Sequence, residues 1–335
     1  MILYFLKRLR RLFKSIGKIE FKFIDKIVLL ENNLIKKKFI LSFEDSKLRD
    51  FQSQLDNKNN FPKKMVILIC FFFKDKKLNN LRKSISQISN YKFRKELIFI
   101  TNELSSIQKK KLNNLTKNKI KNFQIYQTKN LPDNNFLPWF SINLMKEKFK
   151  NKKNTHFMFL EDDIIVNSNN ICYWVFFRKY LKKFNLIPSF LRFENNNRNL
   201  YTIDNPKKIS FKNSPKIFTK GKKFGFINSK YPYSAMYLMD RELMRNYLKS
   251  DAIKIDFSFT NRVMKFLYPI KELLNISYAY LDVPRGFHNK IMIPFNKDKS
   301  IFKYCLIEHS ETKYVKHSRL NKMGYGKILI KDLIN

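Results

Sequence analysis

Apolar runs and amphipathic stretches alternate along the middle of the chain. The runs have the length and the aromatic and β-branched content of buried strands, and the stretches between them carry leucine and isoleucine at helical spacing. The expected strands are residues 65–73, 97–101, 123–128 and 157–166, and the expected helices are residues 76–91, a lysine-rich stretch ending near residue 117, and residues 138–149. Four successive strand and helix units predict an α/β fold with a largely parallel, Rossmann-type sheet flanked by helices.

The pattern is less regular after the fourth strand. We expect a helix at residues 172–184 and strands at residues 189–194 and 233–239, with Asp240 capping a further helix. Residues 195–223 are rich in lysine and asparagine, a composition typical of a loop. The second half of the chain is therefore expected to be less regular than the first.

The pattern before the first strand predicts a helical extension. Residues 1–21 place apolar side chains at helical spacing with lysine and arginine between them, which makes a basic amphipathic helix. Such a helix either lies on an anionic membrane surface or packs on the protein's own core, and the sequence leaves both open. The chain thus divides into an extension at residues 1–63 and a main domain at residues 64–335, whose halves are residues 64–166 and 167–335.

The chain is strongly cationic, with 68 lysine and arginine residues against 27 acids and a formal charge of +41 over 335 residues. Such a field attracts nucleic acid, nucleotide diphosphates, anionic glycans or an anionic membrane face. The basic residues are spread along the chain rather than gathered in one module, which disfavours nucleic-acid binding. The three widely spaced cysteines indicate a reducing, cytoplasmic compartment, and no apolar run reaches the roughly 18 residues of a spanning helix.

Three adjacent acids interrupt the last of the four apolar runs. Glu161, Asp162 and Asp163 follow Phe-Met-Phe-Leu at residues 157–160, near the strand end that open α/β sheets use for ligands. Because side chains alternate along an extended chain, Glu161 and Asp163 are expected to face one way and Asp162 the other. Carboxylates in this position suit a divalent ion beside a phosphorylated substrate. The alternative is an acidic turn after a core strand.

These acids, in a nucleotide-binding half followed by a less regular half, resemble the DxD-type motif of GT-A fold glycosyltransferases. Glu161 stands where the commoner form of the motif has its first aspartate. Residues 162–177, 187–192 and 283–287 also resemble a group of uncharacterised bacterial GT-A-like proteins. The resemblance covers the main domain and implies that its first half binds a nucleotide sugar and its second half the acceptor.

The resemblance also implies a role for each acid. Asp163 would bind Mn²⁺ or Mg²⁺ bridging the donor diphosphate, Glu161 would reach the metal and the sugar or ribose hydroxyls, and Asp162 would position the donor. GT-A enzymes often add a histidine ligand near the C-terminal end of the domain. The candidates are His309, which follows an apolar run in the last expected strand, and His288.

An inverting transferase also needs a general base for the acceptor hydroxyl. The candidates are Asp256, Glu194 and Glu272, with a helix cap or salt bridge as the alternative for Asp256. Arg192 precedes Glu194 by two residues in an alternating strand. Its guanidinium can clamp a phosphate or form an internal ion pair with Glu194 or another neighbour.

The predicted function is transfer of a sugar from a nucleotide-diphosphate sugar to a glycan or lipid-linked acceptor in cell-surface polysaccharide synthesis. The predicted location is cytoplasmic, peripheral at the inner face of the membrane. A basic nucleic-acid-binding protein or a membrane-surface protein without catalysis is the alternative. The first would bring phosphates to an acidic strand end that repels them unless a metal intervenes, and the second leaves those acids without a role.

Overall fold

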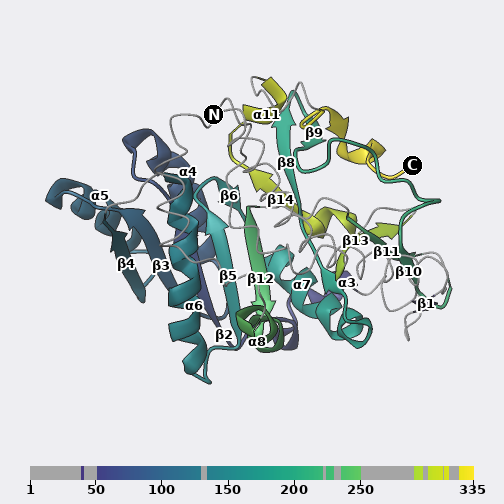
Figure 1. Ribbon diagram of the computed structural model, residues 1–335, viewed down its shortest axis with the longest axis horizontal. Coiled ribbons are helices and arrows are strands. Elements are labelled where there is room, and N and C mark those ends of the chain that lie inside the picture. Colours follow the sequence, from purple (N-terminus) through teal and green to yellow (C-terminus); the bar gives the residue numbers. More distant parts are fainter. Residues whose placement is uncertain are drawn as a thin grey trace, which may run out of the picture.

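The computed structural model describes residues 39–40, 51–129, 134–221, 224–229, 235–249, 290–296, 301–311, 313–316 and 324–335. Strands in this part of the chain form three five-stranded sheets, accompanied by helices (Figure 1). The predicted helix at residues 1–21 and three candidate side chains, Asp256, Glu272 and His288, lie outside the described residues.

The first sheet has the strand order β12-β5-β2-β3-β4. Its strands are β2 (Lys64–Cys70), β3 (Arg94–Asn102), β4 (Phe123–Thr128), β5 (His156–Glu161) and β12 (Met236–Asp240). The neighbours β5, β2, β3 and β4 pair in parallel, and β12 pairs antiparallel with β5 at the edge. This order confirms the predicted α/β class and the largely parallel sheet.

Burial follows from the position of each strand in this sheet. β2 lies in the middle and buries six consecutive side chains, as expected for a parallel strand whose two faces are both covered. β4 lies at the edge, and half-buried and exposed side chains alternate along it. The central strands therefore read as continuous apolar runs, which is why their positions could be predicted.

Three helices connect the parallel strands. They are α4 (Leu78–Ser89), α5 (Ser106–Thr116) and α6 (Phe140–Lys150), and α6 lies across the near face of the sheet in Figure 1. α5 begins at a capping box in which Ser105 and Gln108 exchange side-chain to backbone hydrogen bonds. Pro138 lies in a 3₁₀ segment, so α6 begins two residues later than predicted.

The strand predicted at residues 157–166 is wrong in one respect, because it is two strands. β5 ends at Glu161, and β6 (Ile164–Ile165) belongs to a different sheet. Asp162 and Asp163 form the turn between them. β5 pairs with β2 and β12, whereas β6 pairs with β14, so the chain changes sheets at the two aspartates. The alternation expected for the three acids therefore stops at Glu161.

Most strands of the other two sheets lie to the right of the parallel sheet in Figure 1, and β6 lies above β5. One has the order β15-β9-β8-β14-β6 and the other β1-β10-β11-β13-β7. Their strands besides β6 are β8 (Leu191–Asn196), β9 (Asn199–Thr202), β14 (Leu306–His309) and β15 (Ile328–Leu329) in the former, and β1 (Phe39–Ile40), β7 (Ile187–Pro188), β10 (Lys216–Phe218), β11 (Phe224–Asn228) and β13 (Ile291–Asn296) in the latter.

The loop predicted at residues 195–223 is wrong, because β9 and β10 lie within it. Both strands are short, and most of their side chains are half-buried or exposed. Lysine and asparagine around them therefore hide the alternation that marks a strand. The backbone is paired all the same, β9 with β8 and β10 with β11.

Helix α7 (Ser168–Leu181) is buried along most of its length. It begins four residues earlier than predicted because Asn167 and Asn170 form a capping box, and it continues into a 3₁₀ turn. Phe51 of α3 (Phe51–Gln54) is buried against two phenylalanines of α7. Part of the predicted extension thus joins the core.

Asp240 joins two elements, and the predicted cap is confirmed. Its Oδ1 accepts a hydrogen bond from the backbone N–H of Leu243 at 2.7 Å, at the start of α8 (Arg241–Lys249). Its Oδ2 accepts one from Nε of Arg178 on α7 at 2.9 Å. The Arg178 side chain is almost fully buried. The carboxylate therefore caps one helix and pairs with a buried cation of another.

We expect Asp240→Ala to lower the free energy of unfolding by about 3 kcal/mol, because it removes a cap and leaves a buried guanidinium unpaired. Urea denaturation at neutral pH measures the change. Asp56→Ala is the control, because Asp56 and Lys92 form an ion pair with both side chains mostly exposed. Equal losses in the two variants would contradict the double role of Asp240.

Candidate functional site

The parallel sheet reverses its strand order at β2. The chain runs outward from β2 to β3 and β4 and returns to β5 on the other side of β2. Open α/β sheets bind ligands outside the carboxyl ends of the strands at such a switch point. Cys70 at the end of β2 lies opposite Glu161 at the end of β5, so the residues that follow both strands meet at this edge.

Lys77 reaches Asp162 from the segment after β2, residues 72–77, which the sequence predicts to border the base and ribose of the donor. Its Nζ lies 2.9 Å from Asp162 Oδ1. Burial raises the pKa of Asp162 to about 6, and the Lys77 ammonium only partly opposes this shift. Burial would lower the pKa of Lys77, but Asp162, with smaller contributions from Asp163 and Glu311, more than offsets it, and the pKa is raised. At neutral pH the site therefore holds an ammonium against a largely ionised carboxylate.

Asp163 meets His309 because of strand register. Ile164 of β6 pairs with His309 of β14, and the backbone N–H of Ser310 donates to the carbonyl oxygen of Asp163 at 2.8 Å. His309 Nε2 lies 3.2 Å from Asp163 Oδ2. Two of the predicted metal ligands are thus brought together from positions 146 residues apart in the chain.

Glu194 contacts the same imidazole from its other nitrogen. The parallel pairing of β14 with β8 places Glu194 beside His309, whose Nδ1 lies 2.8 Å from Glu194 Oε1. The buried Glu194 carboxylate also accepts hydrogen bonds from the first three backbone N–H groups of α11 (Lys313–Lys316). These contacts favour a role in orienting His309 over the general-base role predicted from the sequence.

The imidazole of His309 lies between two carboxylates. Burial would lower its pKa, but the hydrogen bonds with Asp163 and Glu194 raise it to about 9. Nδ1 faces two acceptors, Glu194 Oε1 and the carbonyl oxygen of Glu311 at 2.7 Å, so Nδ1 carries a hydrogen. Burial would raise the pKa of Asp163, but the hydrogen bond from His309 lowers it. In the absence of another cation, a proton on Nε2 therefore joins His309 to Asp163.

Arg192 forms the internal ion pair that the sequence left open, with Asp204 as its partner. Its Nε and Nη2 lie 2.9 and 2.7 Å from Asp204 Oδ1, and its backbone N–H donates to Oδ2 at 3.0 Å. Burial raises the pKa of Asp204 although the guanidinium opposes the shift. Engagement with a buried acid disfavours the predicted role of Arg192 as a phosphate clamp. Asp204 is the single acid among residues 195–223, a signal that could have identified it.

The turn between β5 and β6 has the chemistry to bind a divalent cation. Asp162 Oδ2 and Asp163 Oδ1 are buried oxygens without a hydrogen-bond partner among the described residues, and such atoms usually accommodate a water or an ion. The 3.2 Å between Asp163 Oδ2 and His309 Nε2 is close to the ~3 Å that separates adjacent ligands of an octahedral ion with bonds of ~2.1 Å. Glu194 supplies the outer hydrogen bond typical of a metal-bound histidine.

The protein supplies only part of a coordination sphere. Among the described residues, no three histidine, cysteine, aspartate or glutamate side chains gather to hold a metal ion. Magnesium sites built from one or two carboxylates and substrate phosphates have this character. Glu161 lies half-buried at the same edge of the sheet. Burial raises the pKa of the nearby Cys70 thiol, and the negative charge of Glu161 raises it further. Ligation of a metal by Glu161 stays a prediction.

Comparison with known proteins adds a distant likeness. No protein family matches the chain, and no curated protein matches it. The S. aureus TarS 1-349 crystal structure aligns with 55% of this chain and 48% of its own, at 12% identity and a TM-score of 0.33. Another S. aureus TarS structure aligns with 55% of this chain and 29% of its own, at 10% identity and a TM-score of 0.31. The strand order, rather than this likeness, defines the fold class.

In the metal-free protein we expect His309 to titrate near pH 9, above its ordinary value of 6.5. Because the folded-state pKa is the raised one, His309 contributes stability that is fully present below about pH 6.5 and is lost as the pH rises through about 9. NMR titration of chelator-treated protein measures this pKa, and His309→Gln identifies the resonance.

Glu194→Gln retains the size of the side chain but removes its charge, so the pKa of His309 should fall toward 6.5. The same NMR titration measures the fall, and Asp56→Asn is the matched control, which should leave the pKa unchanged. An unaltered His309 pKa in Glu194→Gln would show that the buried pair does not set the charge of the ring.

Proposed function

We propose that the chain is a metal-dependent glycosyltransferase that moves a sugar from a nucleotide-diphosphate sugar to a glycan or lipid-linked acceptor. The observation that carries the proposal is the meeting of Asp163 with His309 beside the pair of Lys77 and Asp162 at the switch edge of the sheet. An ammonium and a cation-binding pair there suit a diphosphate. The resemblance of Glu161, Asp162 and Asp163 to the GT-A motif supports the same reaction.

Asp163 and His309 would hold Mn²⁺ or Mg²⁺, with Glu161 as the predicted further ligand. When bound, the ion would neutralise the charge that develops on the departing nucleoside diphosphate. Glu194 fixes the ring of His309 and keeps the hydrogen on Nδ1. The lone pair of Nε2 would then face the buried carboxylate of Asp163, where a cation would take the place of the second proton.

Lys77 and Asp162 would position the donor. The Lys77 side chain is 30% exposed, and its ammonium has three hydrogens to donate, one of which Asp162 accepts. The remaining donors suit the phosphate oxygens of a nucleotide lying beside Asp163. Asp162 thus acts on the donor through Lys77, by holding the ammonium at the edge of the sheet.

The general base in this proposal is Asp256, with Glu272 as the second candidate. A base must come within ~3 Å of the acceptor hydroxyl, directly or through one water. Glu194 is fully buried and faces His309, which leaves it without access to an acceptor. Both remaining candidates lie outside the described residues.

Asp163→Asn should weaken Mn²⁺-dependent binding of nucleoside diphosphates at least about tenfold, because a neutral amide replaces an anionic ligand. Isothermal titration calorimetry with UDP, GDP and CDP measures the loss, and a screen of nucleotide sugars for Mn²⁺-dependent hydrolysis identifies the donor. Asp56→Asn is the matched control on an exposed acid. Unchanged binding by Asp163→Asn would refute the proposal. Tight, salt-sensitive binding of plain oligonucleotides without a divalent ion would favour the nucleic-acid alternative.

We also propose that the protein works at the cytoplasmic face of a membrane, held there by the basic helix predicted at residues 1–21. None of the helices in the described part of the chain is both long enough and apolar enough to span a bilayer. Deletion of residues 1–21 should release the protein from vesicles that contain anionic lipid, as measured by co-sedimentation. Equal partition of the full and shortened chains would refute this anchoring.

A further inference from the structure

Pairs of basic residues lie at or just before the amino ends of three neighbouring strands of the parallel sheet. The pairs are Lys63 and Lys64, Arg94 and Lys95, and Lys152 and Lys153. Because β5, β2 and β3 are adjacent and parallel, their amino ends lie at one edge of the sheet, with Lys64 opposite Arg94. The topology therefore gathers six cations that are far apart in the sequence.

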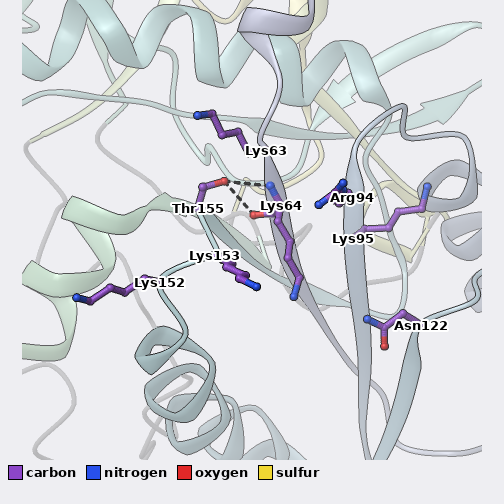
Figure 2. Close-up of a pocket in the computed structure, with 8 residues that line it drawn as sticks. All are labelled: Lys63, Lys64, Arg94, Lys95, Asn122, Lys152, Lys153 and Thr155. Carbon is purple, nitrogen blue, oxygen red and sulfur yellow. Dashed lines mark hydrogen bonds between the residues drawn. The ribbon is translucent and has the colours of Figure 1, made fainter.

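These six residues line a cavity of about 710 Å³ together with Asn122 and Thr155 (Figure 2). Thr155 fixes one wall, because its Oγ1 accepts a hydrogen bond from the backbone N–H of Lys64 at 3.2 Å and donates one to the Lys64 carbonyl oxygen at 2.9 Å. In Figure 2 the side chains of Lys64 and Lys153 extend in the same direction, whereas Lys95 extends along the other side of β3. Rigid strand ends thus carry long cationic side chains around one hollow.

Two of the six cations already have protein partners. Lys64 Nζ lies 3.6 Å from Glu96 Oε2, and Lys148 Nζ lies 2.7 Å from the other oxygen of the same carboxylate. Lys95 donates to two backbone carbonyl oxygens near the end of α4, at 2.9 and 2.8 Å. Burial lowers the pKa of the Lys95 ammonium. Glu96, the acid next to the cavity, is therefore already shared between two lysines.

The other four cations, Lys63, Arg94, Lys152 and Lys153, are exposed. Within the described part of the chain, none of their side chains makes a hydrogen bond or ion pair. The described residues that line the cavity include no acid. Four such charges around a hollow concentrate anions from solution.

The lining also selects the chemical class of the ligand. Its described residues include no aromatic side chain for stacking of nucleic-acid bases and no apolar side chain for an acyl chain. Lysine and arginine bind phosphate oxygens through charge-assisted hydrogen bonds. The cavity volume falls in the range of small-molecule sites.

We propose that this cavity binds an anion with two or more clustered phosphate groups, such as a free polyphosphate or the headgroup of an anionic lipid. Lys63, Arg94, Lys152 and Lys153 hold the phosphates, and Lys64 stays with Glu96 at the base of the site. The site is independent of the one proposed for sugar transfer. β2 runs from Lys64 to Cys70, so about 20 Å of strand separates the two edges.

Isothermal titration calorimetry of the full chain with inorganic tripolyphosphate, without divalent ions, measures binding at the cavity. The cavity variant combines Lys63→Gln, Arg94→Gln, Lys152→Gln and Lys153→Gln. It removes four exposed charges and no described side-chain contact, and should weaken binding at least about tenfold. The control variant combines Lys207→Gln, Lys208→Gln, Lys212→Gln and Lys220→Gln. It has the same net charge but alters exposed positions outside the cavity, and should bind within about twofold of the unmodified chain.

An unweakened cavity variant, or an equal loss in the control variant, would overturn the proposal. Vesicles of phosphatidylcholine with cardiolipin distinguish the two sources of phosphate. Because the helix proposed at residues 1–21 can itself hold the chain on anionic vesicles, the quantity to compare is the part of the vesicle binding that tripolyphosphate competes away. Loss of that part in the cavity variant identifies a lipid headgroup. Vesicle binding that tripolyphosphate does not compete with, alongside lost tripolyphosphate binding in the cavity variant, identifies a free polyphosphate. A duplex oligonucleotide that binds more tightly than tripolyphosphate and loses binding in the same variant would replace the proposal with a nucleic-acid interface.

Discussion

Parallel pairing of β2 with β3 and β5 is the constraint on which both edges of the main sheet depend. The pairing is stable because β2 buries its side chains on both faces, which requires an almost unbroken apolar run. Strands that point the same way collect the residues after them at one edge and the residues before them at the other. The acids and Lys77 at one edge, and the basic pairs at the other, are thus consequences of one arrangement.

The polar groups near the acids form a connected network rather than separate pairs. His309 links Asp163, in the turn between β5 and β6, to Glu194 of β8. The carboxylate of Glu194 also accepts hydrogen bonds from the first backbone N–H groups of α11. In a buried setting such a network gains strength from the low dielectric, and an unpaired member is costly. Asp162 Oδ2 and Asp163 Oδ1, which have no hydrogen-bond partner among the described residues, are therefore places where a bound cation would remove such a cost.

The sequence predicted those parts of the fold whose signal is local. An apolar run identified β2, and helical spacing identified α4, because burial of a face dictates the residues on it. β9 and β10 were not predicted, because each buries few side chains. Asp163 and His309 were paired by resemblance to a motif. The contact of Lys77 with Asp162 could not be predicted, since it depends on tertiary register. The basic pairs are visible in the sequence, but that they lie together at one edge of the sheet follows only from the order of the strands.

Only Asp162 and Asp163 separate β5 from β6, although these strands belong to different sheets. The three Cα–Cα steps from Glu161 to Ile164 span about 11 Å at most, so the sheets cannot slide past one another without moving these carboxylates. A ligand held by Asp163 and His309 consequently binds at the short connection between the two sheets. By linkage, a contact that favours the alignment to which the ligand binds more tightly raises the affinity for the ligand, and the ligand stabilises that alignment by the same factor.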